Sequence, residues 1–227
     1  MTGVELRAVF LDQDAVTTAI LARLLDTGET RRAAAFHFAQ DRTRWIVARA
    51  ALRILLGRQT STPAAQVPIL YGENGKPFLS GHPVHFNLSH SDGQALIVFS
   101  TTGPVGVDLE RHSRGAELTE CMDAFLHPAE THRLEATHNL AARPRALIRT
   151  WCAKEAYLKA LGPGLALPPQ QLIVEWKSDR LARLHPPNTP TLLIHFPDPP
   201  ADYCAAVALP SGLTCPAVDQ LDILPEP

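Results

Sequence analysis

Two stretches of this chain place acidic side chains at spacings that suit the binding of a cation. The first is Gly106-Val107-Asp108-Leu109-Glu110, which has the residue types of a strand. Because alternate side chains of a strand share a face, Asp108 and Glu110 would point the same way while the aliphatic residues pack behind them. The alternative is that both acids are solvent-facing residues of an edge strand.

The second stretch runs from Trp151 to Lys159 and has the spacing of a helix. Its period places Glu155 one turn before Lys159, so an acid and a base lie on one side. With Asp108 and Glu110, Glu155 would complete an oxygen ligand set suited to Mg²⁺, which usually keeps several waters and also binds phosphate oxygens. The alternative is a surface ion pair between Glu155 and Lys159, contributing roughly a few tenths of a kcal/mol.

The composition is that of a globular protein. Its 227 residues, 45% of them hydrophobic, suffice for one large or two small domains. No apolar run approaches the roughly 20 residues of a membrane span, and the N-terminus lacks a secretory pattern, so we expect a cytoplasmic protein without membrane partners. We also expect a monomer. The formal charge of −2 gives no global attraction to nucleic acid. The four cysteines are far apart and lack a CxxC pair, which indicates buried or incidental thiols.

Local patterns predict the elements that would position these acids. A helix is expected from Asp41, as its N-cap, to Gly57, and a tight exposed turn at residues 71–77. Turn signals at Asp92-Gly93 and Thr102-Gly103-Pro104 separate expected strands at 84–88, 95–100 and 105–110.

Further helices are expected at 115–140 and 145–161, the second beginning near Pro144 and ending at Gly162-Pro163-Gly164. A last strand is expected at 203–209. The proline-rich segments at 186–200 and beyond Pro216 indicate loops and a loose tail.

Several motifs in one order carry a family resemblance. They are Gly75-Lys76-Pro77, Asn87-Leu88-Ser89-His90-Ser91, Gly106-Val107-Asp108-Leu109-Glu110 and Trp151-x-x-Lys154-Glu155-Ala156-x-x-Lys159, with support from Phe36-x-Phe38-x-x-Asp41. Any one would be weak evidence, but together, over residues 30–165, the chain resembles the 4′-phosphopantetheinyl transferase superfamily. The resemblance is to its long, single-chain type, which activates surfactin synthetase.

The resemblance implies an α+β fold, a pseudo-dimer of two similar subdomains in one chain, with coenzyme A and Mg²⁺ between them. The expected bounds are 1–103, 104–215 and a tail at 216–227. Such enzymes transfer the 4′-phosphopantetheine arm of coenzyme A to a serine of an apo acyl or peptidyl carrier domain and release adenosine 3′,5′-bisphosphate. The implied partners are therefore coenzyme A and carrier domains, including those of secondary metabolite biosynthesis.

The resemblance also implies roles for single residues. Asp108, Glu110 and Glu155 would bind the metal. Glu155 is the leading candidate for the base that takes the serine proton, with Glu130 as the alternative. Lys159 would neutralise charge on the leaving phosphate or protonate it.

The implied coenzyme site includes several basic residues. His90 would contact the 3′-phosphate, and Lys76 a phosphate or the adenine. Ser89 would either line the nucleotide site or only cap local backbone, and Trp151 would be a core residue anchoring the helix of Glu155. The full coenzyme-binding set is Arg32, Asn74, Gly75, Lys76, Pro77, Asn87, Ser89, His90, Asp108, Glu155 and Lys159.

Two other classes of function use the same residues. One is a coenzyme A-binding module without transfer activity, which the presence of every expected acid and of Lys159 disfavours. The other is a Mg²⁺-dependent nucleotide phosphohydrolase, in which water would replace the serine.

Overall fold

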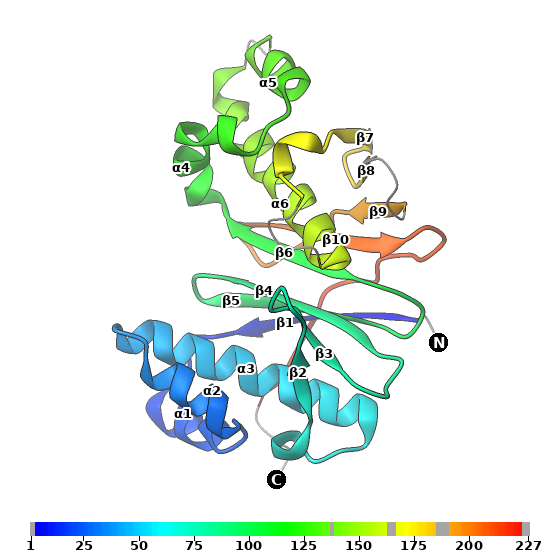
Figure 1. Cartoon of the computed structure of the whole chain (residues 1–227). Helices are drawn as coiled ribbons and strands as arrows, with labels where there is room; N and C mark the ends of the chain where they lie inside the picture. The colour runs from blue at the N-terminus through cyan, green and yellow to red at the C-terminus, as the bar shows by residue number, and fades with distance from the viewer. Residues whose placement is uncertain (1–2, 137–138, 163–166, 185–190, 224–227) are drawn as a thin grey trace.

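The computed structural model describes residues 3–136, 139–162, 167–184 and 191–223. It confirms an α+β fold built from two halves, each a mostly antiparallel sheet with helices on one face (Figure 1). Among the helices in these ranges, none is long and apolar enough to cross a membrane.

The N-terminal half has the sheet order β11-β1-β5-β4 and a separate hairpin of β2 and β3. Its elements are β1 (Val4–Phe10), α1 (Ala15–Ala22), α2 (Thr27–Ala34), α3 (Ala39–Thr60), β2 (Ile69–Tyr71), β3 (Pro77–Leu79), β4 (His85–Ser91) and β5 (Gln94–Ser100). The C-terminal strand β11 (Asp219–Gln220) pairs with β1 in parallel.

The C-terminal half has the sheet order β6-β10-β9-β8-β7. Its elements are β6 (Gly106–Arg111), α4 (Gly115–Glu120), α5 (Pro128–Glu135), α6 (Arg143–Leu161), β7 (Val174–Ser178), β8 (Leu181–Leu184), β9 (Leu192–His195) and β10 (Tyr203–Pro210). Short 3₁₀ helices lie at Ala64–Gln66, His112–Arg114, Met122–Ala124, Leu140–Ala142 and Pro169–Gln171.

The two halves repeat one order of elements, although the sequence shows no repeat. Each begins with a strand, β1 or β6, continues through helices ending in a long one, α3 or α6, and returns to a strand that pairs antiparallel with the first, β5 or β10. This order gives the pseudo-dimer that the resemblance implied. The subdomain bounds at 103 and 215 stay a prediction.

Three apolar cores hold the layers together, in the order α3, first sheet, second sheet, α6 (Figure 1). The middle core joins the two sheets and contains Val107 and Leu109 of β6, with side chains of β1, β5 and β10. The opposite face of β6 lies against α6, whose buried residues share a core with alanines of β10. Asp108 and Glu110 therefore alternate onto the α6 side of the sheet, as the strand periodicity predicts.

The strands at 84–88, 95–100, 105–110 and 203–209 are confirmed within one to three residues of their expected ends. The helix at 145–161 is confirmed as α6, with Pro144 in its first turn and Gly162 as its C-cap at φ 78°. Pro163 and Gly164, also expected in that stop signal, lie outside the described residues.

The expected ends of the helix at residues 41–57 are wrong. The helix α3 begins after Phe38, which makes no side-chain cap hydrogen bond, so Asp41 lies in the first turn, where its charge suits the helix dipole. At the other end α3 continues past Gly57 to Thr60 and stops at Ser61, whose φ is 53°. The chain then turns back over Gly57, where an added Cβ would lie 2.6 Å from the carbonyl oxygen of Thr62.

A single helix over 115–140 is also wrong. The segment breaks into α4, a 3₁₀ turn and α5, because Pro128 cannot continue a preceding helix and instead begins α5. His127 and Glu130 form a capping box at that new start.

The proline-rich segments contain more structure than expected. Within 186–200, residues 192–195 form β9, which pairs with β8 and β10. Beyond Pro216 the chain forms β11 and buries Leu221 and Ile223 in the N-terminal core. The loose-tail expectation is therefore wrong up to residue 223, because strand pairing with β1 and the burial of two apolar side chains hold this segment. Residues 186–190 and 224–227 lie outside the described ranges.

The position of α6 depends on Gly106 at the start of β6. A Cβ added there would lie 2.5 Å from the amide nitrogen of Ala160 and closer still to the carbonyl oxygen of Ala156. Both are helix backbone atoms, which cannot move aside as a flexible side chain would. Glycine at this position lets α6 lie directly on the strand that carries the two acids.

We predict that Gly106→Ala lowers the free energy of unfolding by roughly 1–3 kcal/mol, the usual cost of overpacking. Urea unfolding measures it. The control is Gly72→Ala, where the nearest atom to the added Cβ is 3.7 Å away. Equal stabilities of the two variants would contradict the close approach of α6.

Candidate functional site

The site begins at a seam between the halves, where edge strand β4 lies beside edge strand β6. Three backbone N–H groups of β6 donate to side chains of β4. The bonds join Val107 N to Asn87 Oδ1 (2.9 Å), Leu109 N to Ser89 Oγ (3.3 Å) and Arg111 N to Ser91 Oγ (3.2 Å). Alternate residues of β4 thus replace the neighbouring strand that this edge of β6 lacks.

The same serines reach the acids of β6. Ser89 donates to Asp108 Oδ1 at 3.0 Å, and Lys159 Nζ donates to that oxygen at 2.5 Å. Lys159 also donates to Ser89 Oγ at 3.1 Å. Asp108 is only 3% exposed, which excludes the solvent-facing alternative. Its second oxygen, Oδ2, is buried and has no hydrogen-bond partner in the described part of the chain.

Glu110 is held on three sides. Its Oε2 accepts from Ser91 Oγ at 3.1 Å, and its Oε1 accepts from Arg114 Nη1 at 2.6 Å and from Trp151 Nε1 at 3.2 Å. Trp151 also packs edge-on against Phe125, with ring centroids 5.1 Å apart. The tryptophan, expected as a core residue, is half-buried and links α6 to Glu110 as well.

Glu155 projects from α6 without a hydrogen bond or ion pair to any described residue. Burial raises the pKa of Glu155, and the negative charges of Asp108 and Glu110 raise it further against the opposing effect of Lys159. Lys159 pairs with Asp108, so the alternative of a surface Glu155–Lys159 ion pair is wrong. Burial lowers the pKa of Lys159, but Asp108 and Glu155 outweigh it and the pKa is raised overall, which keeps the amine charged.

A cleft of ≈ 300 Å³ lies where the β2–β3 hairpin of the first half meets α6 of the second. It is lined by Asn74, Gly75, Lys76, Pro77, Asn87, Leu88, Glu155, Leu158, Lys159 and Gly162. Seven of these were expected in the coenzyme site from sequence. The structure thus brings together residues that lie more than 80 positions apart in the chain.

The hairpin is tied directly to the end of α6. Lys76 Nζ donates to the carbonyl oxygens of Lys159 and Ala160, both at 2.6 Å, and Asn74 Nδ2 donates to Gly162 O at 3.1 Å. A cation at these last carbonyls suits the helix dipole. Burial lowers the pKa of Lys76 to about 8. Two of its three N–H donors are used, which leaves one for a ligand.

His90 and Arg32 are not among the residues that line the cleft. His90 follows Ser89 on β4, so its ring lies on the opposite face of the strand and stays open to solvent. Partial desolvation lowers the pKa of His90, and the positive charges of Lys159 and Arg44 lower it further. Arg32 is exposed in the last turn of α2.

Glu130, the alternative base, lies in a different environment. Its Oε2 accepts from Lys154 Nζ at 2.5 Å and from the backbone of His127 at 2.9 Å, while Oε1 accepts from Val174 N at 2.8 Å. Lys154 is fully buried and also donates to Phe125 O at 2.7 Å. Glu130 therefore joins α5, α6 and β7, a structural arrangement that disfavours it as the base.

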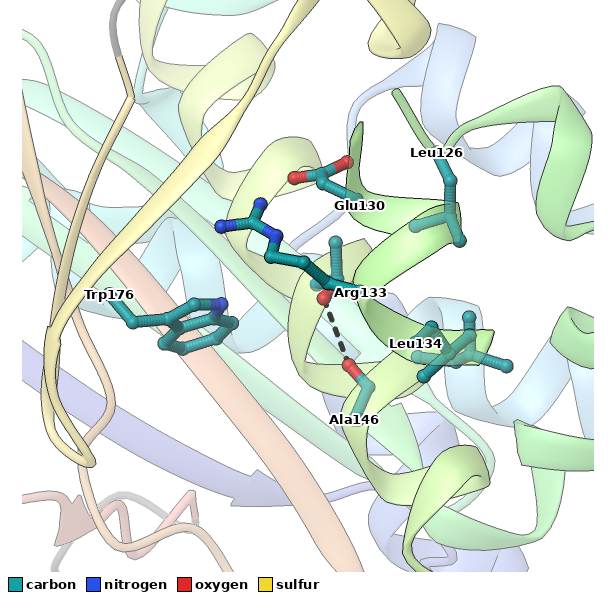
Figure 2. Close-up of a pocket in the computed structure, with 8 residues that line it drawn as sticks. Leu126, Glu130, Arg133, Leu134, Ala146 and Trp176 are labelled. Atoms are coloured by element: carbon teal, nitrogen blue, oxygen red, sulfur yellow. Dashed lines mark hydrogen bonds between the residues drawn. The ribbon is translucent and has the colours of Figure 1, made fainter. Parts of the chain in front are cut away.

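Glu130 borders a separate hollow of ≈ 230 Å³ on the C-terminal half. Figure 2 shows Glu130 and Arg133 extending from α5 toward it, with Trp176 of β7 on the other side. This hollow shares no lining residue with the cleft.

The three expected metal ligands lie close enough for the charges of Asp108 and Glu110 to act on Glu155, but their carboxylates do not form a preassembled metal site. Within the described ranges, no three His, Cys, Asp or Glu side chains make a metal-binding group. The residues nevertheless fit a hard cation, because neither the buried Asp108 Oδ2 nor the carboxylate of Glu155 has a hydrogen-bond partner among the described residues. Metal binding by Asp108, Glu110 and Glu155 stays a prediction.

Some residues of the site were not identified from sequence. Ser91 continues the alternation of Asn87 and Ser89, so the strand period alone could have found it. Leu88, Leu158 and Gly162 are ordinary packing or cap residues that border the cleft only through the fold. Arg114 and Lys154 carry no periodic signal, because their partners lie in other elements.

Comparisons with known proteins agree with this geometry. The model of the 4′-phosphopantetheinyl transferase superfamily matches residues 104–208, and a model named 4′-phosphopantetheinyl transferase, N-terminal, matches residues 14–102. The 4′-phosphopantetheinyl transferase HetI of a Nostoc species is 32% identical over 213 residues, 92% of this chain and 88% of the relative.

The chain therefore belongs to the 4′-phosphopantetheinyl transferase superfamily, a class of enzymes. A Synechocystis relative is 36% identical over 63% of this chain and 59% of its own length. The 4′-phosphopantetheinyl transferase of Bacillus subtilis is 28% identical over 63% of each chain. The matched segment thus spans less than two thirds of the length of these two relatives. The long, single-chain subtype stays a prediction.

Removing Glu130 and removing Glu155 should have different effects on the stability of the folded protein. We predict that Glu130→Ala lowers the free energy of unfolding by roughly 3–5 kcal/mol, because it leaves Lys154 buried and unpaired. Glu155→Ala should change it by less than about 0.5 kcal/mol, since Glu155 makes no hydrogen bond or ion pair with a described residue. Urea unfolding measures both, with Glu130→Gln as the variant to use if Glu130→Ala does not fold. A larger loss for Glu155→Ala would contradict the assignment.

Proposed function

We propose that the protein transfers the 4′-phosphopantetheine arm of coenzyme A to a serine of an apo acyl or peptidyl carrier domain. The observation that carries this proposal is the cleft between the halves, which collects Asn74, Lys76, Asn87, Glu155 and Lys159. Phosphoryl transfer requires mainly positioning and charge neutralisation, and a cleft with a free acid beside a fixed cation offers both.

Glu155 is the proposed base. The serine hydroxyl gives its proton to this carboxylate, and its oxygen attacks the phosphorus that carries the pantetheine. The bond from that phosphorus to the oxygen of the adenosine 5′-phosphate breaks, and adenosine 3′,5′-bisphosphate leaves with the negative charge. Glu155 suits this step because it lines the cleft and has no partner among the described side chains to compete for the proton.

Lys159 is the proposed partner of the leaving phosphate. Its amine is held by Asp108 and Ser89, so it presents a fixed positive charge at the wall of the cleft. A cation that is already positioned needs no reorganisation when charge develops on the leaving group.

Asp108, Glu110 and Glu155 would hold Mg²⁺. When bound there, the ion would contact diphosphate oxygens and offset their charge. The strand residues contribute the first two ligands from one face, and α6 contributes the third.

Lys76 and His90 are the proposed readers of the nucleotide phosphates. Lys76 lines the cleft and keeps one N–H that the carbonyl oxygens of α6 do not use. At His90 the positive charges of Lys159 and Arg44 outweigh the negative charge of Asp41. A positive region of this kind favours a phosphate dianion.

One assay separates transfer from the two alternative functions. The protein is incubated with coenzyme A, Mg²⁺ and several apo carrier domains, and the carriers are weighed by mass spectrometry. A gain equal to the phosphopantetheine arm supports the transferase. Release of adenosine 3′,5′-bisphosphate without carrier would favour the hydrolase, and coenzyme binding without either product would favour the inactive module.

We predict that transfer needs a divalent cation and that Asp108→Ala abolishes it while the protein remains folded, because a hard ion would lose a ligand. Glu155→Gln should lose far more rate than Glu110→Ala, since it removes ligand and base together. Carrier modification with and without chelator measures these effects, and Asp198→Ala, at an exposed salt bridge, is the control. Full turnover by Asp108→Ala in metal-stripped buffer would contradict the proposed role of the metal ion.

We also predict that Lys76→Ala and His90→Ala raise KM for coenzyme A. The increase should correspond to a loss of roughly 1–3 kcal/mol in binding free energy, as expected for a charge-assisted hydrogen bond. With dephospho-coenzyme A, the penalty should be much smaller for any residue that contacts the 3′-phosphate, as in a double-mutant cycle. Lys177→Ala and His132→Ala, both exposed in the C-terminal half, are matched controls. An equal penalty with both substrates would exclude that residue from the 3′-phosphate.

A further inference from the structure

Arg114 lies on Glu110 from the solvent side. It is the last residue of the 3₁₀ helix that follows β6, and its Nη1 is 2.6 Å from Glu110 Oε1. The arginine side chain is 41% exposed, whereas that of Glu110 is 9% exposed. A partly exposed cation therefore covers a nearly buried acid that is also a proposed metal ligand.

Each acid of β6 has a cation of its own. Asp108 Oδ1 accepts from Lys159, and Glu110 Oε1 accepts from Arg114 and Trp151. The two positions differ in freedom, because Lys159 is held by α6 and Ser89 while Arg114 reaches in from solvent. A carboxylate oxygen has about two lone-pair sites, so Arg114 and Trp151 together fill Oε1.

Arg114 also has an outer partner. Its Nε lies 3.2 Å from Oε2 of Glu117, whose side chain is 71% exposed. The guanidinium thus bridges an inner acid and an outer acid. Glu117 offers the arginine a place to remain paired when its contact with Glu110 weakens.

We propose that Arg114 is a competing cation that sets the affinity of the acidic cluster for a divalent metal ion. In the absence of metal it neutralises Glu110, and metal binding requires it to give up part of that contact in favour of Glu117. This inference rests on the proposed function, because it takes Asp108, Glu110 and Glu155 as the ligands.

The sign of the effect follows from charge. A divalent ion at Glu110 would lie within a few ångströms of the arginine charge, so removing that charge should tighten binding by roughly three- to tenfold in a partly solvated site. Removing Glu117 should act in the opposite direction, by roughly twofold, because Arg114 would then be shared by fewer acids.

The test is a Mn²⁺ titration of the unliganded protein, in which electron paramagnetic resonance reports the free ion. Arg114→Gln should bind more tightly than the wild type, Glu117→Gln more weakly, and Arg114→Lys about equally because the charge is kept. Arg180→Gln removes the same charge from an exposed pair with Asp198 and should leave the affinity unchanged.

The outcomes separate this inference from the metal site itself. If the wild type binds Mn²⁺ and Asp108→Ala does not, the ligand set is supported. In that case, an unchanged or weaker affinity of Arg114→Gln overturns the role of Arg114 alone. Binding by Arg114→Gln but not by the wild type would support it. Binding by neither protein overturns the inference together with the ligand set, and equal tightening in Arg180→Gln overturns it as a general charge effect.

Discussion

The rest of the structure depends on the side-chain ladder between β4 and β6. The outward N–H groups of Val107 and Leu109 would otherwise be buried without acceptors, at a cost of roughly 1–3 kcal/mol each, and that of Arg111 is partly buried. Asn87, Ser89 and Ser91 supply the acceptors from the other half of the chain. Since two of these side chains also donate to Asp108 and Glu110, the junction of the halves and the acidic site are one construction.

This construction explains how two acids can be buried side by side on one strand face. Burying an ionised carboxylate is costly unless it is paired and hydrogen-bonded. Asp108 receives Lys159 from α6, and Glu110 receives Arg114 from the segment after β6. The first pairing requires α6 to lie against β6, which Gly106 permits by having no side chain. Backbone packing and site electrostatics are therefore coupled at a single residue.

The sequence correctly predicted the side-chain positions that depend on the geometry of a single strand or helix. Strand period placed Asp108 and Glu110 on a shared face, and helix period placed Glu155 and Lys159 on the same wall of the cleft. It failed where the partner lies elsewhere in the fold. Lys159 pairs with Asp108 rather than with its neighbour Glu155, because the strand acid is buried and no other described cation reaches it. Likewise, the segment beyond Pro216 was expected to be loose because its proline-rich composition does not reveal that Leu221 is buried in the N-terminal core.

The adjacent residues Lys154 and Glu155 show how α6 divides its faces between structure and chemistry. Neighbours on a helix point about 100° apart, so one can enter the core while the next borders a cleft. Lys154 is fully buried and pairs with Glu130, which fixes the helix against α5 and β7. That attachment leaves Glu155 beside the cleft without a described partner, so its orientation depends on the neighbouring lysine rather than on bonds of its own. The acid best placed to accept a proton is thus the one that the fold leaves uncommitted.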